Sequence, residues 1–275
     1  MSTSWMIASG KGGVGKSTIA ASLGVAMARE GRSVCVIDAD IGLRDQDVLL
    51  GLENRIVFDL LDVANGSCTL EQALISPEGM SRLSLLPARQ FARAKELEPK
   101  AFRRMLTRLK ERFDVILIDC PAGIERGVRG LMNCEVDESV IICTPDDVCI
   151  RNAERMASVM DKKGLPRPRL IVNRLQEELI AAGEMYAAAT VAATLDMPLL
   201  GEIPEDNAIC RATLRHISPM DIDCQARRAL TRIAWRMLDT GLDAPLPGYG
   251  TARKPWYRRL FRKTPKLKEV QRIDC

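Results

Sequence analysis

The chain has 275 residues, of which 47% are hydrophobic and 28% charged, and its net charge is +4. This length is enough for one sizeable α/β core or two small domains, and the composition is ordinary for a globular protein. No apolar run is long enough to cross a bilayer, and residues 1–10 lack a basic stretch followed by an apolar one, so we expect neither a transmembrane helix nor a signal peptide.

Apolar segments alternate with helical stretches along the chain, which predicts repeated βα units. Seven segments are candidate strands, and many of them are uniformly apolar and rich in Val and Ile, as in strands buried on both faces: 5–8, 33–38, 82–86, 114–119, 139–143, 169–172 and 199–203. The helical stretches between them include residues 17–29, 99–111, 148–162 and 224–238. We therefore predict the α/β class, with a doubly wound, mostly parallel sheet and helices on both of its faces.

A glycine-rich loop follows the first predicted strand and opens a helix. Residues 10–17 read GKGGVGKS, which matches the phosphate-binding pattern GxxxxGK[ST]. Glycines let the backbone wrap closely around phosphates, and the N–H groups at a helix N-terminus attract the anion. We expect Lys16 to reach the β- and γ-phosphates of ATP and the Ser17 hydroxyl to ligate Mg²⁺. The predicted nucleotide-binding residues of this loop are Gly10, Gly12, Gly13, Val14, Gly15, Lys16, Ser17 and Thr18.

Three carboxylates follow strands that should end beside this loop. Asp38 and Asp40 end the second predicted strand, where short acidic side chains point into the ligand crevice of a parallel sheet. We assign Asp40 to positioning the attacking water and Asp38 to the surroundings of the phosphate and metal; helix capping is the alternative for both. Asp119 ends the apolar run VILID, and together with the phosphate loop it is predicted to hold Mg²⁺ through a water.

The extra lysine at position 11 adds specificity. The run KGGVGKS resembles the deviant Walker A loop of the MinD/ParA superfamily of ATPases. That resemblance implies that Lys11 reaches across a dimer to the nucleotide of the partner subunit and takes part in catalysis. It also implies that Asn173, Arg174 and the loop with Pro204 and Asp206 hold the adenine, whereas on the residues alone these are turn residues at strand ends.

Longer segments resemble the MinD family, bacterial ATPases that help to place the division septum. They are residues 38–75, 85–90, 119–127 and 201–212, and the resemblance extends over about residues 3–240. It implies an ATP-dependent homodimer that binds the membrane when loaded with ATP and recruits a division inhibitor of the MinC type. Hydrolysis is then slow until a partner, such as a topology factor, or the membrane stimulates it.

The C-terminal segment is predicted to meet the membrane. Residues 251–275 carry nine Lys or Arg against two acidic residues, a net +7 that leaves −3 for residues 1–250. Plotted at 100° per residue, one side of a short helix holds Trp256, Tyr257, Leu260 and Phe261, and the other holds Arg258, Arg259, Arg262 and Lys263. We predict an ATPase domain at 1–241, a linker rich in Pro and Gly at 242–253, and a tail at 254–275 that binds anionic lipid. A disordered basic tail, or one that docks on the body, is the alternative.

Other functions remain open at this point. A ParA-type ATPase that positions chromosomes, plasmids or flagella would spread basic residues over its body, and a body at −3 disfavours that reading and a nucleic-acid partner. An iron–sulfur carrier ATPase needs paired or precisely placed cysteines at a dimer interface. The nine cysteines of this chain include no CxxC pair, and neither Cys120 nor Cys149 has a second cysteine at that spacing. A nucleotide-gated scaffold without turnover is disfavoured by Asp40 and Asp119. We expect buried thiols in a reducing compartment. Without a signal peptide the protein should be cytoplasmic, and the resemblance and the basic tail imply that it is peripheral on the cytoplasmic face of the membrane.

Overall fold

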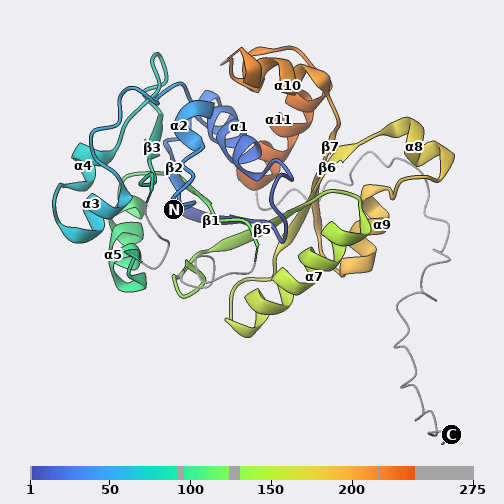
Figure 1. Ribbon diagram of the computed structural model, residues 1–275, viewed down its shortest axis with the longest axis horizontal. Coiled ribbons are helices and arrows are strands. Elements are labelled where there is room, and N and C mark those ends of the chain that lie inside the picture. Colours follow the sequence, from blue (N-terminus) through green and yellow to red (C-terminus); the bar gives the residue numbers. More distant parts are fainter. Residues whose placement is uncertain (1, 92–95, 124–130, 216, 239–275) are drawn as a thin grey trace, which may run out of the picture.

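The structure is a computed structural model that describes residues 2–91, 96–123, 131–215 and 217–238. The predicted linker at 242–253 and the predicted membrane-binding tail at 254–275 lie outside the described residues. Within them, one sheet is covered by helices on both faces (Figure 1).

All seven predicted strands are present, and every pairing between them is parallel. The sheet order is β3-β2-β4-β1-β5-β6-β7. The bounds are β1 Thr3–Ala8, β2 Val34–Asp38, β3 Leu83–Leu86, β4 Val115–Asp119, β5 Glu138–Cys143, β6 Arg169–Leu175 and β7 Leu199–Pro204. The predicted fold class is confirmed. From β1 the chain runs out to β2 and β3, returns to β4 beside β1, and continues through β5, β6 and β7 on the other side. The winding therefore reverses at β1, and a ligand crevice is expected at the carboxyl end of this strand.

The sixth strand is longer than the sequence predicted. It was expected to end at residue 172, but β6 continues to Leu175, with a register shift against β7 between Val172 and Leu175. Arg174 has a φ of 62°, in the left-handed region that few non-glycine residues adopt. The polar pair Asn173 and Arg174 therefore marks an irregularity within the strand, which from sequence looks the same as its end.

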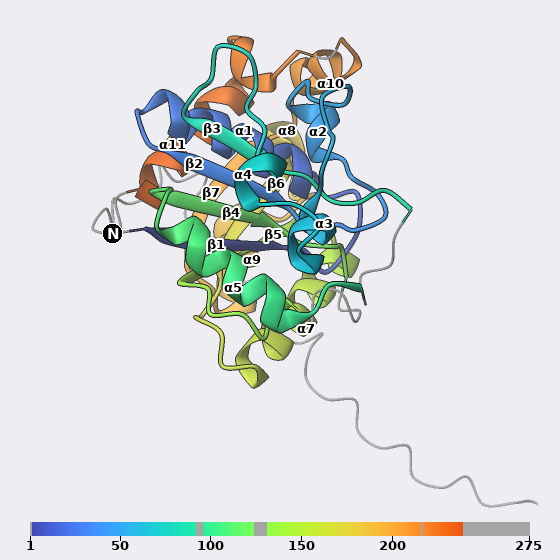
Figure 2. The same ribbon diagram turned by 90° about the vertical axis from the view of Figure 1, so that its left-hand side faces the viewer.

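Helices α1 and α11 cover one face of the sheet, and α5, α7 and α9 cover the other (Figure 1). Seen from the β3 edge, α3 and α4 lie in front of the sheet (Figure 2). The helices are α1 Lys16–Arg29, α2 Gln46–Leu49, α3 Leu60–Asn65, α4 Leu70–Ala73, α5 Pro99–Lys110, α7 Asp147–Lys162, α8 Glu177–Ala182, α9 Ala188–Leu195, α10 Asn207–Leu214, the 3₁₀ helix η2 Pro219–Asp221 and α11 Gln225–Leu238.

The helix after the phosphate loop is the most deeply packed. α1 packs on the sheet beside α11, and most of its side chains are small and buried. A Cβ at Gly24 would lie 2.8 Å from Cγ2 of Val36 in β2, so glycine lets α1 approach the sheet this closely. The close packing fixes where α1 begins, and therefore where its first N–H groups point.

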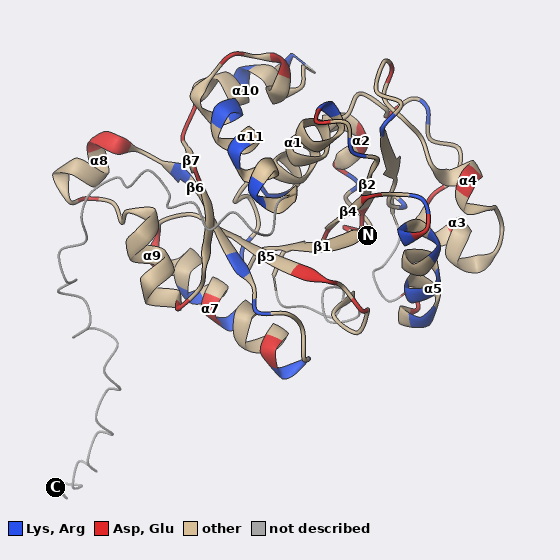
Figure 3. Cartoon of the chain, turned by 180° about the vertical axis from the view of Figure 1, so that it is seen from behind, with Lys and Arg blue, Asp and Glu red and all other residues tan. Residues whose placement is uncertain are grey.

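Cysteines and charges are distributed as in an ordinary α/β domain. All eight cysteines in the described residues are free, and five of them are buried. No group of three or more potential metal-ligating His, Cys, Asp or Glu side chains occurs in this part of the chain. Acidic and basic residues are interspersed over the helices, with several basic ones on α5 and α11 (Figure 3). In the same ranges, every helix is too short or too polar to span a bilayer.

Candidate nucleotide site

The loop between β1 and α1 presents uncapped N–H groups at the carboxyl end of the central strand. α1 begins at Lys16, and its N-cap residue Gly15, with φ of 91°, has no side chain to bond the first N–H groups. The first turn contains no acidic residue. The positive end of the helix dipole and its unsatisfied donors therefore face the loop, which suits a phosphate group.

Two asparagines, Asn152 in α7 and Asn173 in β6, lie in close contact with this loop. A Cβ at Gly10 would lie 2.4 Å from the backbone of Asn152 in α7, and a Cβ at Gly15 would lie 2.6 Å from Nδ2 of Asn173 in β6. The same Nδ2 donates to the carbonyl of Val14 at 2.8 Å. Glycine is therefore required at both positions, and the contact found for Asn173 supports the phosphate loop; its adenine contact stays a prediction.

Lys16 and Asp119 form a buried ion pair at the centre of the site. Nζ of Lys16 lies 2.6 Å from Oδ1 of Asp119, and the two side chains are 6% and 1% exposed. Burial alone would lower the pKa of Lys16, but the charge and hydrogen bond of Asp119 outweigh burial and raise this pKa above its ordinary value. The structure thus holds a permanent cation beside the phosphate loop, against the carboxylate predicted to hold the metal.

The two aspartates at the end of β2 differ in accessibility. Asp38 is fully buried: Oδ1 accepts a hydrogen bond from the N–H of Asp40 at 3.0 Å, and Oδ2 accepts one from the N–H of Gln46 at 3.1 Å. Burial and the neighbouring charge of Asp119 raise the pKa of Asp38 to about 8. Asp40 is half-buried, and burial raises its pKa as well. Asp38 therefore fixes the loop shape, while Asp40 is open to solvent, as its predicted water-positioning role requires.

Gln46 is a site residue that sequence reasoning missed. It begins α2, is fully buried, and its Nε2 donates to Oδ2 of Asp119 at 2.7 Å and to the carbonyl of Ser17 at 3.0 Å. The only signal was a polar residue eight positions beyond Asp38, in a segment too short for any helical periodicity.

The predicted magnesium residues lie together and offer suitable donors. The side-chain amide of Gln46 donates hydrogen bonds both to the backbone carbonyl of Ser17 and to the carboxylate of Asp119. Carboxylate, hydroxyl and amide oxygens are the ligands and water acceptors that Mg²⁺ prefers. Oε1 of Gln46 is buried and has no hydrogen-bond partner among the described residues, so the site still offers an acceptor. These residues fit a magnesium ion that arrives with a nucleotide.

Lys11 contacts its own subunit in this structure. Its Nζ lies 3.7 Å from Oδ1 of Asp146, and both side chains are about half exposed, at 46% and 45%. Asp146 is the N-cap of α7 and also accepts hydrogen bonds from the N–H of Cys149 and the hydroxyl of Thr144. The lysine predicted to reach a partner is therefore held by a solvent-exposed ion pair at the start of α7.

The predicted adenine residues do not converge as tightly as the phosphate residues do. Arg174 is exposed. Asp206 caps α10, accepting from the N–H of Ala208 at 2.9 Å, and also accepts from the N–H of Ala226 at 3.2 Å. Its carboxylate thus joins α10 to α11. The turn-residue alternative describes the contacts seen here, and adenine binding by Arg174, Pro204 and Asp206 stays a prediction.

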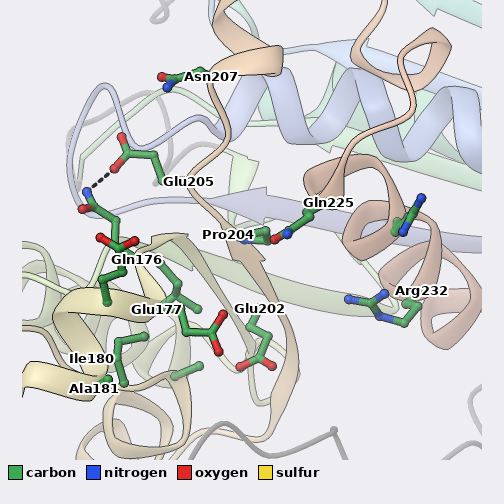
Figure 4. Close-up of a pocket in the computed structure, with 14 residues that line it drawn as sticks. Gln176, Glu177, Ile180, Ala181, Glu202, Pro204, Glu205, Asn207, Gln225 and Arg232 are labelled. Atoms are coloured by element: carbon green, nitrogen blue, oxygen red, sulfur yellow. Dashed lines mark hydrogen bonds between the residues drawn. The ribbon is translucent and has the colours of Figure 1, made fainter.

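Pro204 lines a groove of about 1100 Å³ between α8, α9, β7 and α11 (Figure 4). Glu177 and Glu202 lie on one side of it and Arg232 on the other, and Glu205 accepts a hydrogen bond from Gln176 at its rim. Most of its lining residues are polar or charged, and it lies at the β7 edge of the sheet, opposite the β3 edge.

Comparison with known proteins identifies the family. The model of the CobQ/CobB/MinD/ParA nucleotide binding domain matches residues 5–220. The septum site-determining protein MinD of Bacillus subtilis (strain 168) is 38% identical over 245 residues, which are 88% of this chain and 90% of that protein. The chain belongs to the MinD family.

Solved MinD structures share the fold over nearly their whole length. The MinC:MinD cell division protein complex of Aquifex aeolicus aligns with a TM-score of 0.82 and 34% identity, covering 91% of this chain and 100% of that one. MinD of Pyrococcus horikoshii OT3, solved with Mg-ADP, aligns with a TM-score of 0.77 and 28% identity, covering 90% and 100%. The chain therefore has a MinD-like role in cell division, in a family of nucleotide-binding ATPases.

Proposed function

We propose that the chain is an ATP-driven switch. It binds ATP with Mg²⁺, forms a homodimer, attaches to the cytoplasmic face of the membrane and brings a division inhibitor of the MinC type there, which restricts where the septum forms. The observation that carries this proposal is the buried Lys16–Asp119 pair beside an uncapped helix N-terminus. A cation kept charged in a buried site, next to free N–H donors, is suited to bind the phosphates of a nucleotide.

Each residue of the phosphate end has a task in hydrolysis. The loop N–H groups and Lys16 bind the phosphates, while Ser17 and Asp119 hold magnesium, which when bound neutralises charge on the phosphates. Asp40 orients the attacking water, since it is the carboxylate of the β2 end that solvent reaches. Asp38 keeps Asp40 in place by accepting a hydrogen bond from its N–H.

Lys11 makes the hydrolysis rate depend on the dimer. Its pair with Asp146 is long and exposed, and exposed ion pairs contribute only about 0–1 kcal/mol to stability. Lys11 can therefore leave Asp146 at small cost and reach the nucleotide of a partner subunit, as the family resemblance implies. Turnover is then slow in the monomer and rises when a partner or the membrane favours the dimer.

Hydrolysis is tested by phosphate release with ATP, Mg²⁺ and vesicles containing anionic lipid. Asp40→Ala should lower the stimulated rate by about 10²-fold or more, because a positioned carboxylate contributes on that scale, while fluorescent ATP still binds. Asp45→Ala is the matched control, since Asp45 is exposed in the same segment and its side chain makes no cap to α2. Equal rates for wild type and Asp40→Ala would overturn the catalytic role.

Membrane binding is tested by sedimentation with the same vesicles. The body is net −3 and residues 251–275 are net +7, so the tail should carry the attraction to anionic lipid. Two tails on one dimer bind together, which can raise affinity by about 10²–10⁴-fold. We expect pelleting that needs both ATP and the tail, by comparison with ADP and with a chain ending at residue 250. Pelleting that ignores the nucleotide would make the tail a constitutive anchor.

A MinC-type partner is supported by the likeness to the MinC:MinD complex structure of Aquifex aeolicus. The test is co-sedimentation of a MinC protein with the vesicle-bound chain, which should require ATP. The alternative of a ParA-type positioning ATPase predicts instead that ATP drives the chain onto DNA, and binding to DNA in place of vesicles would favour it.

A further inference from the structure

Gln46 connects three parts of the site through two chemically separate sets of bonds. Its backbone N–H donates to Oδ2 of Asp38 at 3.1 Å, which anchors α2 to the end of β2. Its side-chain Nε2 donates to Oδ2 of Asp119 and to the carbonyl of Ser17, at the end of β4 and in the first turn of α1. A substitution of the side chain therefore leaves the backbone anchor in place.

The orientation of the Gln46 amide is fixed by its neighbours. Both groups within reach of Nε2 are oxygens that only accept hydrogen bonds, so the reverse orientation would set Oε1 against two acceptors. Oε1 consequently points away from them, and it is buried without a hydrogen-bond partner in the described part of the chain. Native structures rarely leave a buried amide oxygen unbonded, so this atom is suited to a donor that the protein does not supply.

Gln46 and Lys16 each bind a different carboxylate oxygen of Asp119. Lys16 holds Oδ1 at 2.6 Å and Gln46 holds Oδ2 at 2.7 Å. When Lys16 turns to bind the phosphates of a nucleotide, it no longer pairs with the Asp119 carboxylate. The Gln46 amide is neutral, so the phosphate charge does not draw it away from Asp119. The amide therefore keeps Asp119 oriented when Lys16 is engaged elsewhere.

We propose that Gln46 is a positioning residue of the magnesium site, which rests on the function proposed above. Its Nε2 fixes the Asp119 carboxylate, and its Oε1 offers an acceptor to a water that the cation carries. Partners of this kind, one step removed from the metal, typically change metal affinity by about 10–100-fold when they are removed. Gln46 thus sets how much Mg²⁺ the site needs, without contributing to the binding of the nucleotide itself.

The test is the Mg²⁺ dependence of fluorescent ADP binding by the full chain. Gln46→Leu keeps a side chain of similar volume in a buried position and removes both polar atoms. We expect the Mg²⁺ midpoint to rise by about 10-fold or more, with ADP affinity in EDTA within about twofold of wild type. Val48→Ala, which changes an exposed side chain of the same short helix, should leave both quantities unchanged.

Other outcomes overturn the inference. Equal Mg²⁺ midpoints for wild type and Gln46→Leu would remove the metal role, and an equal loss of ADP affinity with Mg²⁺ and in EDTA would reduce Gln46 to a structural residue. If Gln46→Leu does not fold, Gln46→Met, unbranched and of the same length, replaces it with the same expectations. A wild-type chain that binds no ADP would overturn the proposed function as well, whereas equal midpoints with normal ADP binding overturn this inference alone.

Discussion

The phosphate end of the candidate site differs in construction from the base end, by which we mean the residues predicted to hold the adenine. At the phosphate end, Lys16, Asp38, Gln46 and Asp119 are all buried, and their charges and amides bond one another. At the base end, Arg174 is exposed, and the carboxylate of Asp206 accepts hydrogen bonds from the backbone N–H groups of Ala208 and Ala226.

This difference matches the part of the nucleotide that each end is proposed to bind. Phosphates are strongly charged, so they are bound by charged side chains in a buried site. Because an unpaired buried charge is costly, these side chains must pair with one another while no ligand is bound. A base is flat and uncharged, so backbone turns whose N–H and C=O groups meet its edge suffice. The phosphate end should therefore be sensitive to the loss of single charges, and the base end should respond mainly to changes in its backbone.

The largest effect should come from Lys16→Met. Removing the cation leaves the Asp119 carboxylate buried with Gln46 as its remaining donor, and breaking a buried pair in this way costs about 3–5 kcal/mol of unfolding free energy. Nucleotide binding should be lost as well. Urea denaturation at pH 7 and fluorescent ATP binding measure the two effects.

The same substitution in a surface pair is the matched control. Lys110 lies 2.8 Å from Asp137 in a partly exposed ion pair, so Lys110→Met should cost about 1 kcal/mol or less. Comparable losses of unfolding free energy for the two variants would contradict the distinction between a buried phosphate end and an ordinary surface.

The second effect is a pH dependence caused by Asp38. Its pKa is raised from 3.8 to about 8 by burial and by the charge of Asp119, so the folded state binds more protons than the unfolded state between these values. Its contribution to stability is therefore fully present below pH 3.8 and is lost as the pH rises toward about 8. Asp38→Asn, which cannot ionise, should be less stable than wild type at pH 5 because it loses an acceptor, and the gap should narrow or reverse by pH 8.

Asp114→Asn should show the opposite pH dependence of stability, because the pKa of Asp114 is lowered whereas that of Asp38 is raised. Hydrogen bonds from the N–H and hydroxyl of Ser33 lower the pKa of Asp114. Its contribution to stability is present above its unfolded pKa and is lost as the pH falls through the folded value, so the gap between wild type and this variant should shrink only in acid. Urea midpoints measured across this pH range decide the matter, and parallel curves for Asp38→Asn and wild type would contradict the shift.

The sequence predicted those parts of the molecule that leave a local pattern. The strands were recognisable because buried parallel strands are runs of Val and Ile, and the phosphate loop because its glycines, lysine and hydroxyl are consecutive. The Lys16–Asp119 pair joins residues 103 positions apart, so only the assumption that both serve one nucleotide brought them together. Gln46 could not be found, since its role depends on where a four-residue helix lies. The end of β6 was missed because the backbone of Arg174 turns left-handed within the strand.

The smallest effect should come from the base end, with Asp206→Ala. Both carboxylate oxygens already bond backbone N–H groups of α10 and α11, and loss of a helix N-cap typically costs about 0.5–2 kcal/mol. We expect a loss of unfolding free energy in that range, with the ratio of ATP to GTP affinity unchanged, because the carboxylate acts by holding the turn after Pro204 in shape. Thermal unfolding and competition binding with the two nucleotides measure both.

Asp206→Asn sharpens this last comparison because it keeps one acceptor oxygen of the cap while removing the charge. If capping is the whole role, Asp206→Asn should recover most of the stability that Asp206→Ala loses, and neither variant should change the preference for ATP. If the carboxylate instead reads the base, both variants should lower the ATP-to-GTP ratio, and a fall of about tenfold, equivalent to roughly 1.4 kcal/mol, would show that the base end also relies on a side-chain charge.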